Sequence, residues 1–135
     1  MVNSPLVAMG WVAAAFAGAL LLSALVSRLQ RWAMRRRPVE DLERVLPEAR
    51  EYETLAVYFY SPQCGHCHAL TPLMERLHEE GRRLVLVDVR ERPEVALALG
   101  VAGTPTLVRI RGRRIDDVLI GAQGETKIRR FLEAT

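Results

Sequence analysis

Charged side chains are absent from the first 27 of the 135 residues. Within that stretch, Pro5 to Val26 is nearly all apolar, and its 22 residues would form a helix of about 33 Å, enough to cross a hydrocarbon core of about 30 Å. A cleaved signal peptide would carry basic residues ahead of a shorter apolar core. Because Lys and Arg are absent before Arg28, the sequence favours an uncleaved membrane anchor over residues 1–27 and disfavours a signal peptide.

Arginine is concentrated directly after this apolar segment. Basic residues next to a membrane span stay on the cytoplasmic side, where the anionic leaflet also attracts them. We therefore expect residues 28–38 to be an Arg-rich linker at the lipid bilayer. The protein would cross the cell membrane once, with its N-terminus outside and the following domain in the cytoplasm. The five arginines are Arg28, Arg31, Arg35, Arg36 and Arg37.

The rest of the chain lacks a basic excess. From Pro38 onward it carries 14 basic and 16 acidic side chains, a net charge of −2, which argues against nucleic-acid binding. Inside the apolar segment, Gly10, Ala14 and Gly18 have the spacing of a helix-dimer contact. Chance readily produces that spacing in an Ala-rich stretch, so the sequence predicts at most a weak transmembrane-helix dimer.

Cysteine is scarce, and its two occurrences, Cys64 and Cys67, are three positions apart in Cys-Gly-His-Cys. The pair follows an apolar, β-rich run over residues 55–60 and opens an amphipathic helical pattern. A CxxC at a strand-to-helix junction is typical of a redox-active dithiol. Backbone N–H groups of the first helical turn point at the first sulfur there, and the helix dipole favours its thiolate.

Two other uses of the cysteines are open. His66 and His68 lie close enough in sequence to be metal ligands, but a structural zinc site usually takes a second ligand pair from a distant segment, and His78 is about three turns along the helix from Cys67. The remaining form of the metal-binding alternative is a metal ion shared between two copies of the chain. A purely structural disulfide is disfavoured in a cytosolic domain, unless the source is a hyperthermophile. His66 is either an exposed filler or a titratable donor beside the Cys64 thiolate.

Hydrophobic periodicity predicts a mixed α/β domain after the anchor. Strand–helix alternation followed by a hairpin indicates a sheet with helices on both faces. The expected helices are 39–46 (with Pro38 in its first turn), one from Cys64 that Gly81 ends, 93–99 and 125–133, and the expected strands are 55–60, 84–89, 106–110 and 115–120, the last two joined by a turn over 111–114.

Three segments of this pattern resemble the thioredoxin-fold family: VYFYSPQCGHC, VAGTPTLVRIRG and GAQGETKIRRFLEA. Cys-Gly-His-Cys is the form found in protein disulfide isomerases, and the resemblance covers roughly residues 40–135. It implies a thioredoxin-like domain over 39–135. In that domain Cys64 would be the attacking thiolate and Cys67 the buried resolving thiol. It also implies a cis Pro105, although only about 5–6% of X–Pro bonds are cis.

Other roles also follow only from the resemblance. Gly65, His66, Tyr58 and Pro105 would support the dithiol, and Gln63, Thr104 and Pro105 would contact an extended substrate. The sequence departs from the family at three places. Tyr58 stands where relatives have a buried carboxyl, Leu86 where thioredoxins often have Lys, and Gln63 where they have Trp. The first two departures remove the usual proton-transfer groups, and the third bears on substrate preference.

The sequence thus predicts a membrane-anchored thiol–disulfide oxidoreductase that reduces protein disulfides. It would need no metal or organic cofactor, but a redox partner would have to reset the dithiol. An inverted topology would make it an extracytoplasmic oxidase or isomerase. The rivals from other classes are a non-catalytic module that presents the Pro105 edge to extended peptides and a metal-binding membrane protein.

Overall fold

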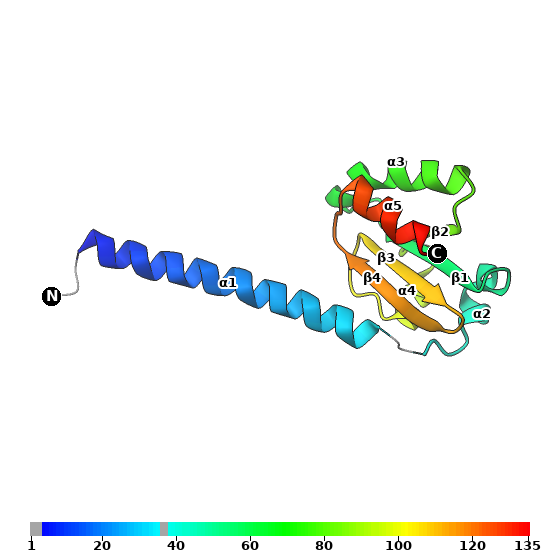
Figure 1. The fold of residues 1–135 in the computed structure, drawn as a ribbon, viewed down its shortest axis with the longest axis horizontal. Helices are drawn as coiled ribbons and strands as arrows, with labels where there is room; N and C mark the ends of the chain where they lie inside the picture. Colours follow the sequence, from blue (N-terminus) through cyan, green and yellow to red (C-terminus); the bar gives the residue numbers. More distant parts are fainter. Residues whose placement is uncertain (1–3, 36–37) are drawn as a thin grey trace.

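The structure is a computed structural model that describes residues 4–35 and 38–135 and places a long N-terminal helix beside an α/β domain (Figure 1). The domain contains a four-stranded sheet with the strand order β2-β1-β3-β4. Strand β1 is parallel to β2 and antiparallel to β3, and β3 and β4 form an antiparallel hairpin, so the sheet is mixed as expected. The strands are β1 Thr54–Tyr60, β2 Leu84–Asp88, β3 Thr106–Arg111 and β4 Arg114–Ile120.

Strand β1 is buried because helices cover both faces of the sheet. Side chains of a strand alternate between the faces, and both sets are apolar here. Leu55, Val57 and Phe59 join the core cluster that α2 and α4 close, whereas Ala56 and Tyr58 join the cluster under α3 and α5. These helices are α2 Leu42–Val45, α3 Gly65–Glu79, α4 Pro93–Leu99 and α5 Glu125–Glu133.

The regular elements lie within a residue or two of their expected bounds. Helices α4 and α5 begin and end at the predicted residues. Gly100 follows α4 with a φ of 70°, and Gly81 follows α3 with a φ of 82°. Only glycine adopts such a φ at little cost, which explains why both helices stop there. The hairpin is tighter than expected, since β3 and β4 continue to Arg111 and Arg114 and leave a two-residue turn.

The helix expected over residues 39–46 is wrong in extent. The structure has one turn, α2, preceded by Asp41 at φ 53° and followed by a 3-10 turn over Pro47–Arg50. Pro38 lies outside any helix and forms an isolated β-bridge with Arg114, and the N–H of Val39 donates to the Arg113 carbonyl at 2.9 Å. Pairing with the hairpin therefore holds this segment extended where its periodicity predicted a helix.

The N-terminal helix α1 spans Pro5–Met34 and continues past the expected anchor. Its most apolar 18-residue window has a mean hydropathy of 2.0 and is unburied by the domain. By length and composition this helix can cross a membrane, although a signal sequence would meet the same criterion. Arg28 and Arg31 lie on its last turns, and the Arg36 and Arg37 of the expected linker lie outside the described residues.

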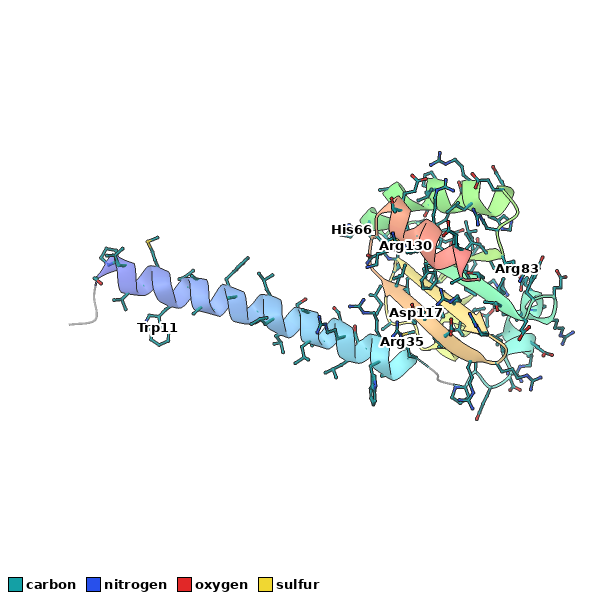
Figure 2. All side chains as sticks on the ribbon, in the orientation of Figure 1. Trp11, Arg35, His66, Arg83, Asp117 and Arg130 are labelled. Carbon is teal, nitrogen blue, oxygen red and sulfur yellow. A yellow bond between two sulfur atoms is a disulfide. The ribbon has the colours of Figure 1, made fainter. Side chains whose placement is uncertain are left out.

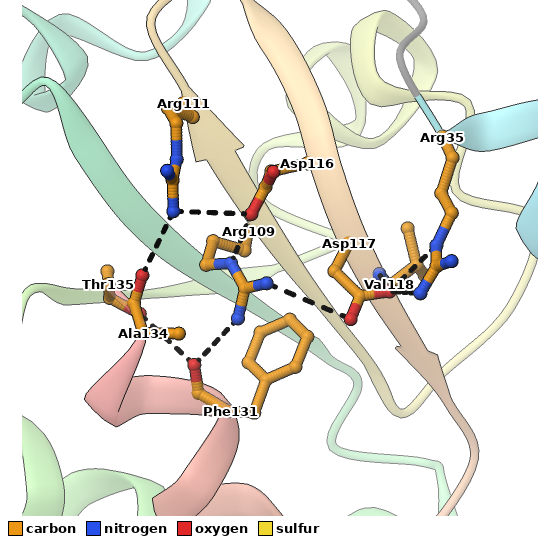
Figure 3. A network of polar contacts seen from close by, with 9 residues as sticks. All are labelled: Arg35, Arg109, Arg111, Asp116, Asp117, Val118, Phe131, Ala134 and Thr135. Atoms are coloured by element: carbon orange, nitrogen blue, oxygen red, sulfur yellow. Dashed lines mark hydrogen bonds and ion pairs between the residues drawn. The ribbon is translucent and has the colours of Figure 1, made fainter.

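A polar network joins the end of α1 to the sheet and to α5 (Figure 3). Arg35 forms an ion pair with Asp117 on β4, and the other Asp117 oxygen lies 3.8 Å from Arg109. Arg109 pairs with Asp116 at 2.6 Å, donates to the Phe131 carbonyl at 2.9 Å and stacks its guanidinium 4.6 Å from the Phe131 ring centroid. The partly exposed Arg35–Asp117 pair thus extends a more buried cluster, which gives it fixed partners.

Two leucines of α4 test this packing, because Leu99 is 0% exposed and Leu97 is 77% exposed. Leu99→Ala should lower the free energy of unfolding by about 2–5 kcal/mol, since it leaves a cavity in the core. Leu97→Ala should change it by less than about 0.5 kcal/mol. Urea unfolding of the full chain in detergent measures both, and equal effects would contradict the packing described here.

Candidate active site

The two cysteines lie where β1 delivers the chain to α3. β1 ends at Tyr60, a short turn follows, and Cys64 is the residue that caps the N-terminus of α3. Its Sγ accepts a hydrogen bond from the backbone N–H of Cys67 at 3.3 Å. Cys64 and Cys67 form a disulfide, with their Cα atoms 5.2 Å apart. The first sulfur therefore occupies the position where helix N–H groups and the helix dipole stabilise a thiolate after reduction.

The two sulfurs differ in accessibility. Cys64 is half-buried, whereas Cys67 is 2% exposed and faces the core side of α3 with Leu70 and Met74. An external disulfide can therefore reach Cys64 but not Cys67. In the reduced protein the accessible sulfur is the one suited to attack, and the buried sulfur is suited to react only with its neighbour.

The loop before β3 forms the other wall of the site. The Thr104 carbonyl oxygen lies 3.6 Å from Cys64 Sγ, and the Thr104–Pro105 peptide bond is cis. Hydrogen bonds hold the loop on both sides: the Thr106 hydroxyl donates to the Gly103 carbonyl at 2.7 Å, and the Gly121 N–H donates to the Pro105 carbonyl at 2.9 Å. The main chain at Thr104 consequently lies next to the sulfur that a substrate would reach.

The residues around the dithiol form an exposed rim. Gln63, Gly65 and His66 are all exposed, and Figure 2 shows His66 at the end of the domain that α1 approaches. His68 is exposed on the next turn, while His78 has its Nδ1 2.7 Å from the Leu84 carbonyl oxygen and so serves packing between α3 and β2. The structure thus brings His66, but not His78, to the dithiol.

Metal binding has no preformed site in the described part of the chain. Among residues 4–35 and 38–135, no group of three or more His, Cys, Asp and Glu side chains is arranged to hold a metal ion. The nearest donors to the sulfurs in sequence are His66 and His68, whose side chains are exposed.

Tyr58 lies fully buried beneath the site on β1, next to Leu86 in the parallel pairing with β2. Its hydroxyl is 3.1 Å from the Thr71 hydroxyl, and its ring stacks on Tyr60 with centroids 5.8 Å apart. Burial raises the Tyr58 pKa above its ordinary value, and the Thr71 hydrogen bond only partly opposes this effect. Tyr58 therefore stays neutral at physiological pH and is no substitute for a carboxylate base.

Thr71 is a site residue that the sequence analysis missed. It lies four positions after Cys67 on α3, on the turn directly behind the buried sulfur, and it is half-buried. Its i, i+4 spacing from Cys67 could have identified it from the sequence.

Tyr58, Pro105, Thr106 and other side chains also line a cavity of about 10 Å³. The polar side chains that line this cavity are those of Tyr58, Thr106 and Gln123, and no carboxylate is among them.

Comparison with protein families gives one match that covers most of the domain. The thioredoxin family model matches residues 42–134. Thioredoxin 1 of Nostoc is 32% identical over 80 residues, which is 57% of this chain and 75% of that protein. Protein disulfide-isomerase of Gallus gallus is 39% identical over 83 residues, which is 48% of this chain but only 16% of that much longer protein.

A solved structure agrees with these matches. The X-ray structure of Fasciola hepatica thioredoxin superimposes with a TM-score of 0.57 and 31% identity, covering 70% of this chain and 90% of that one. The shared part is the domain, because α1 precedes the residues that the family model matches. The chain therefore has the fold of this family, and the matched residues include the CxxC.

The Tyr58 environment predicts a pH dependence. When Cys67 attacks a mixed disulfide on Cys64, its thiol must lose a proton, and a neutral Tyr58 does not accept it readily. The rate of this step should therefore rise with pH up to the thiol's own pKa, ordinarily about 8.5. Tyr58→Glu should speed the step near pH 7 and destabilise the fold, because it buries an ionisable group.

Single-turnover kinetics of the mixed disulfide, followed from pH 6 to 9 in both proteins, measure this dependence. Tyr58→Phe is the matched control, since it removes the hydroxyl and keeps the ring, and it should retain the rising profile. A flat profile in the unsubstituted chain, with no gain from Tyr58→Glu, would mean that another group takes the proton.

Proposed function

Because this chain belongs to the thioredoxin family of thiol–disulfide oxidoreductases, we propose that it is a membrane-anchored reductase of protein disulfides. The observation that carries the proposal is the position of Cys64. It is the accessible sulfur, at a helix N-terminus and 3.6 Å from the Thr104 carbonyl oxygen. A disulfide in an extended segment that pairs with the backbone of Thr104 would meet this sulfur directly.

The proposed reaction uses only the two cysteines. The Cys64 thiolate attacks one sulfur of the substrate disulfide, a Cys64–substrate bond forms, and the other substrate sulfur leaves and takes up a proton. Cys67 then loses its proton and attacks Cys64, which releases the second substrate thiol. Two electrons and two protons pass to the substrate, and the chain ends with the Cys64–Cys67 disulfide seen in the structure. A reducing partner must then restore the dithiol.

The rim residues are proposed to tune this chemistry. His66 lies between the two cysteines and is exposed, so its cationic form would stabilise the Cys64 thiolate. Gln63 and Thr104 would contact the substrate chain on the two sides of the sulfur, and Pro105 would shape that edge. Gly65 would leave the approach to Cys64 open, since a Cβ added there has nothing within 4 Å.

The membrane anchor and the direction of the reaction are part of the same proposal. Helix α1 carries no charged side chain from Pro5 to Ser27, and the arginines begin at Arg28. The positive-inside rule therefore favours a cytoplasmic domain, where the surrounding redox potential drives reduction. In the opposite orientation the same dithiol would face an oxidising space and act as an oxidase or isomerase. A non-catalytic binding module is the second alternative.

An insulin-reduction assay with dithiothreitol separates the reductase from the binding module. The full chain in detergent should accelerate insulin precipitation, and Cys64→Ser should abolish the acceleration because it removes the attacking sulfur. Cys67→Ser should instead accumulate a mixed disulfide with insulin, which non-reducing electrophoresis and mass spectrometry detect. If the unsubstituted chain does not accelerate precipitation, the binding module becomes the better interpretation.

Protease protection in spheroplasts measures the orientation. External protease should leave residues 38–135 intact, because five arginines follow the apolar segment and none precedes it. Detergent lysis is the control and should expose the domain to digestion. Moving three of the arginines ahead of Pro5 should invert part of the population. Digestion of the domain from outside in the unsubstituted protein would support the oxidase or isomerase alternative.

A further inference from the structure

The end of the anchor helix lies beside the loop that carries the substrate-binding backbone. The last turns of α1 and the residues before Thr104 line a cavity of about 440 Å³ between helix and domain. The start of β3 and the end of β4 complete the lining, at the same end of the sheet as the dithiol. Its lining includes Gln30, Ala33 and Met34 from α1, residues 100–103 from the loop, and Thr106 and Ile120 from β3 and β4.

The contacts after the helix show which way α1 projects. Arg35 pairs with Asp117 in the middle of β4, and Pro38 then bridges to Arg114 at the hairpin. The chain thus moves from the Ile120 end of β4 toward the hairpin as it leaves the helix. From Met34 back toward Pro5, α1 therefore extends beyond the end of the sheet that carries the dithiol. Figure 2 shows the same: His66 lies on the side toward which α1 projects, and Arg83 lies on the far side.

The length of α1 keeps the domain close to the bilayer. Seven residues, from Arg28 to Met34, follow the uncharged part of the helix, which corresponds to about 10 Å. That distance is comparable to the headgroup region beside the hydrocarbon core. Trp32 in this stretch is 76% exposed, as expected for an aromatic side chain at the membrane interface.

Charge is distributed unequally between the two ends of the domain. Three of the loops at the dithiol end, 61–66, 100–105 and 121–124, contain no Asp, Glu, Lys or Arg, whereas the fourth, which follows the parallel strand β2, carries Arg90, Glu91 and Arg92 after Asp88. The loops at the opposite end, 51–53, 81–83 and 111–114, contain Glu51, Glu53, Arg82, Arg83, Arg111, Arg113 and Arg114. The three uncharged loops, which include the one that carries Cys64, can therefore approach lipid headgroups without acidic repulsion and without dehydrating charges of their own.

From this arrangement we infer that the dithiol faces the bilayer surface and that its substrates are disulfides of membrane proteins located close to the headgroups. The inference rests on the proposed reductase function and adds a substrate class to it. The polar network at Arg35, Asp117 and Arg109 acts as the positioning device, because it joins the end of α1 to β4 (Figure 3).

The orientation can be measured with nitroxide labels in the full chain. In a Cys64→Ser, Cys67→Ser background, His66→Cys or Arg83→Cys carries the label, and the protein is placed in nanodiscs that contain some nickel-chelating lipid. Nickel at the headgroups should relax the label at position 66 more strongly than the label at 83. A flexible Gly/Ser insertion of about ten residues after Arg35 should reduce this difference. Equal relaxation, a reversed order or failure to enter the bilayer would overturn the inference.

The substrate class is tested with two anchored peptides in proteoliposomes. Both carry the same disulfide loop, placed either directly after a transmembrane helix or beyond a flexible spacer of about 40 residues. The full chain should reduce the membrane-proximal disulfide about threefold faster or more, and the ten-residue insertion should bring the ratio to one or below. Insulin reduction in detergent should be the same with and without the insertion.

These readouts keep the two proposals separate. If neither protein reduces insulin, the proposed reductase function fails. If insulin is reduced but the spacer peptide is reduced as fast as the proximal one or faster, the reductase function stands and the membrane-facing inference is overturned.

Discussion

Burial of β1 on both faces is the constraint from which the site follows. A strand covered by helices on both sides and paired at both edges can leave the core only at its ends. At its carboxyl end the chain turns through residues 61–63 and caps α3 with Cys64. The antiparallel pairing of Phe59 with Thr106 places Pro105 and Thr104 at the same end. The Cys64 sulfur and the backbone of Thr104 therefore meet because one buried strand positions both.

The same burial shapes the electrostatics beneath the dithiol. The family resemblance led us to expect a carboxyl at the position of Tyr58, whereas a neutral phenol fills the space and bonds to Thr71. A buried phenol costs little because its hydroxyl has a partner and its ring packs, but it gives up a proton only at high pH. Tyr58 in place of a carboxyl thus replaces a base by the packed hydroxyl pair of Tyr58 and Thr71. It leaves the first half of the reaction at Cys64 unchanged and acts on the second half, at Cys67.

The position of α1 gives this domain a direction that a free domain lacks. An exposed ion pair by itself contributes little, but Arg35 binds an Asp117 that Arg109 also approaches, and Arg109 is held by Asp116 and Phe131. Such a network restricts how the helix end can tilt against β4. Under the proposed anchoring, this restriction would do more than concentrate the protein at the membrane, because it would select which disulfides the dithiol can meet.

The elements and the dithiol could be read from the sequence because their signals are local. The continuous apolar run of β1 and the 3.6-residue period of α3 and α5 reflect which side chains each element buries, and the positive-φ Gly81 and Gly100 mark helix ends. The spacing of Cys64 and Cys67 identified the chemistry for the same reason. The resemblance to a known family, and not any local signal, suggested that Pro105 is cis.

The rest depended on contacts between distant parts of the chain. The apolar residues of 39–46 have a helical period. Pro38 and Val39 nevertheless pair with the hairpin at Arg114 and Arg113, and these backbone contacts outweigh the local preference. The hydroxyl pair of Tyr58 and Thr71 joins a strand to a helix. The ion pair that orients α1 joins residues 82 positions apart. The sequence alone therefore determined which elements form and where the two sulfurs lie along the chain. Only the tertiary structure decided what lies beneath those sulfurs and which way they face, because side chains far apart in sequence meet only once the sheet has formed.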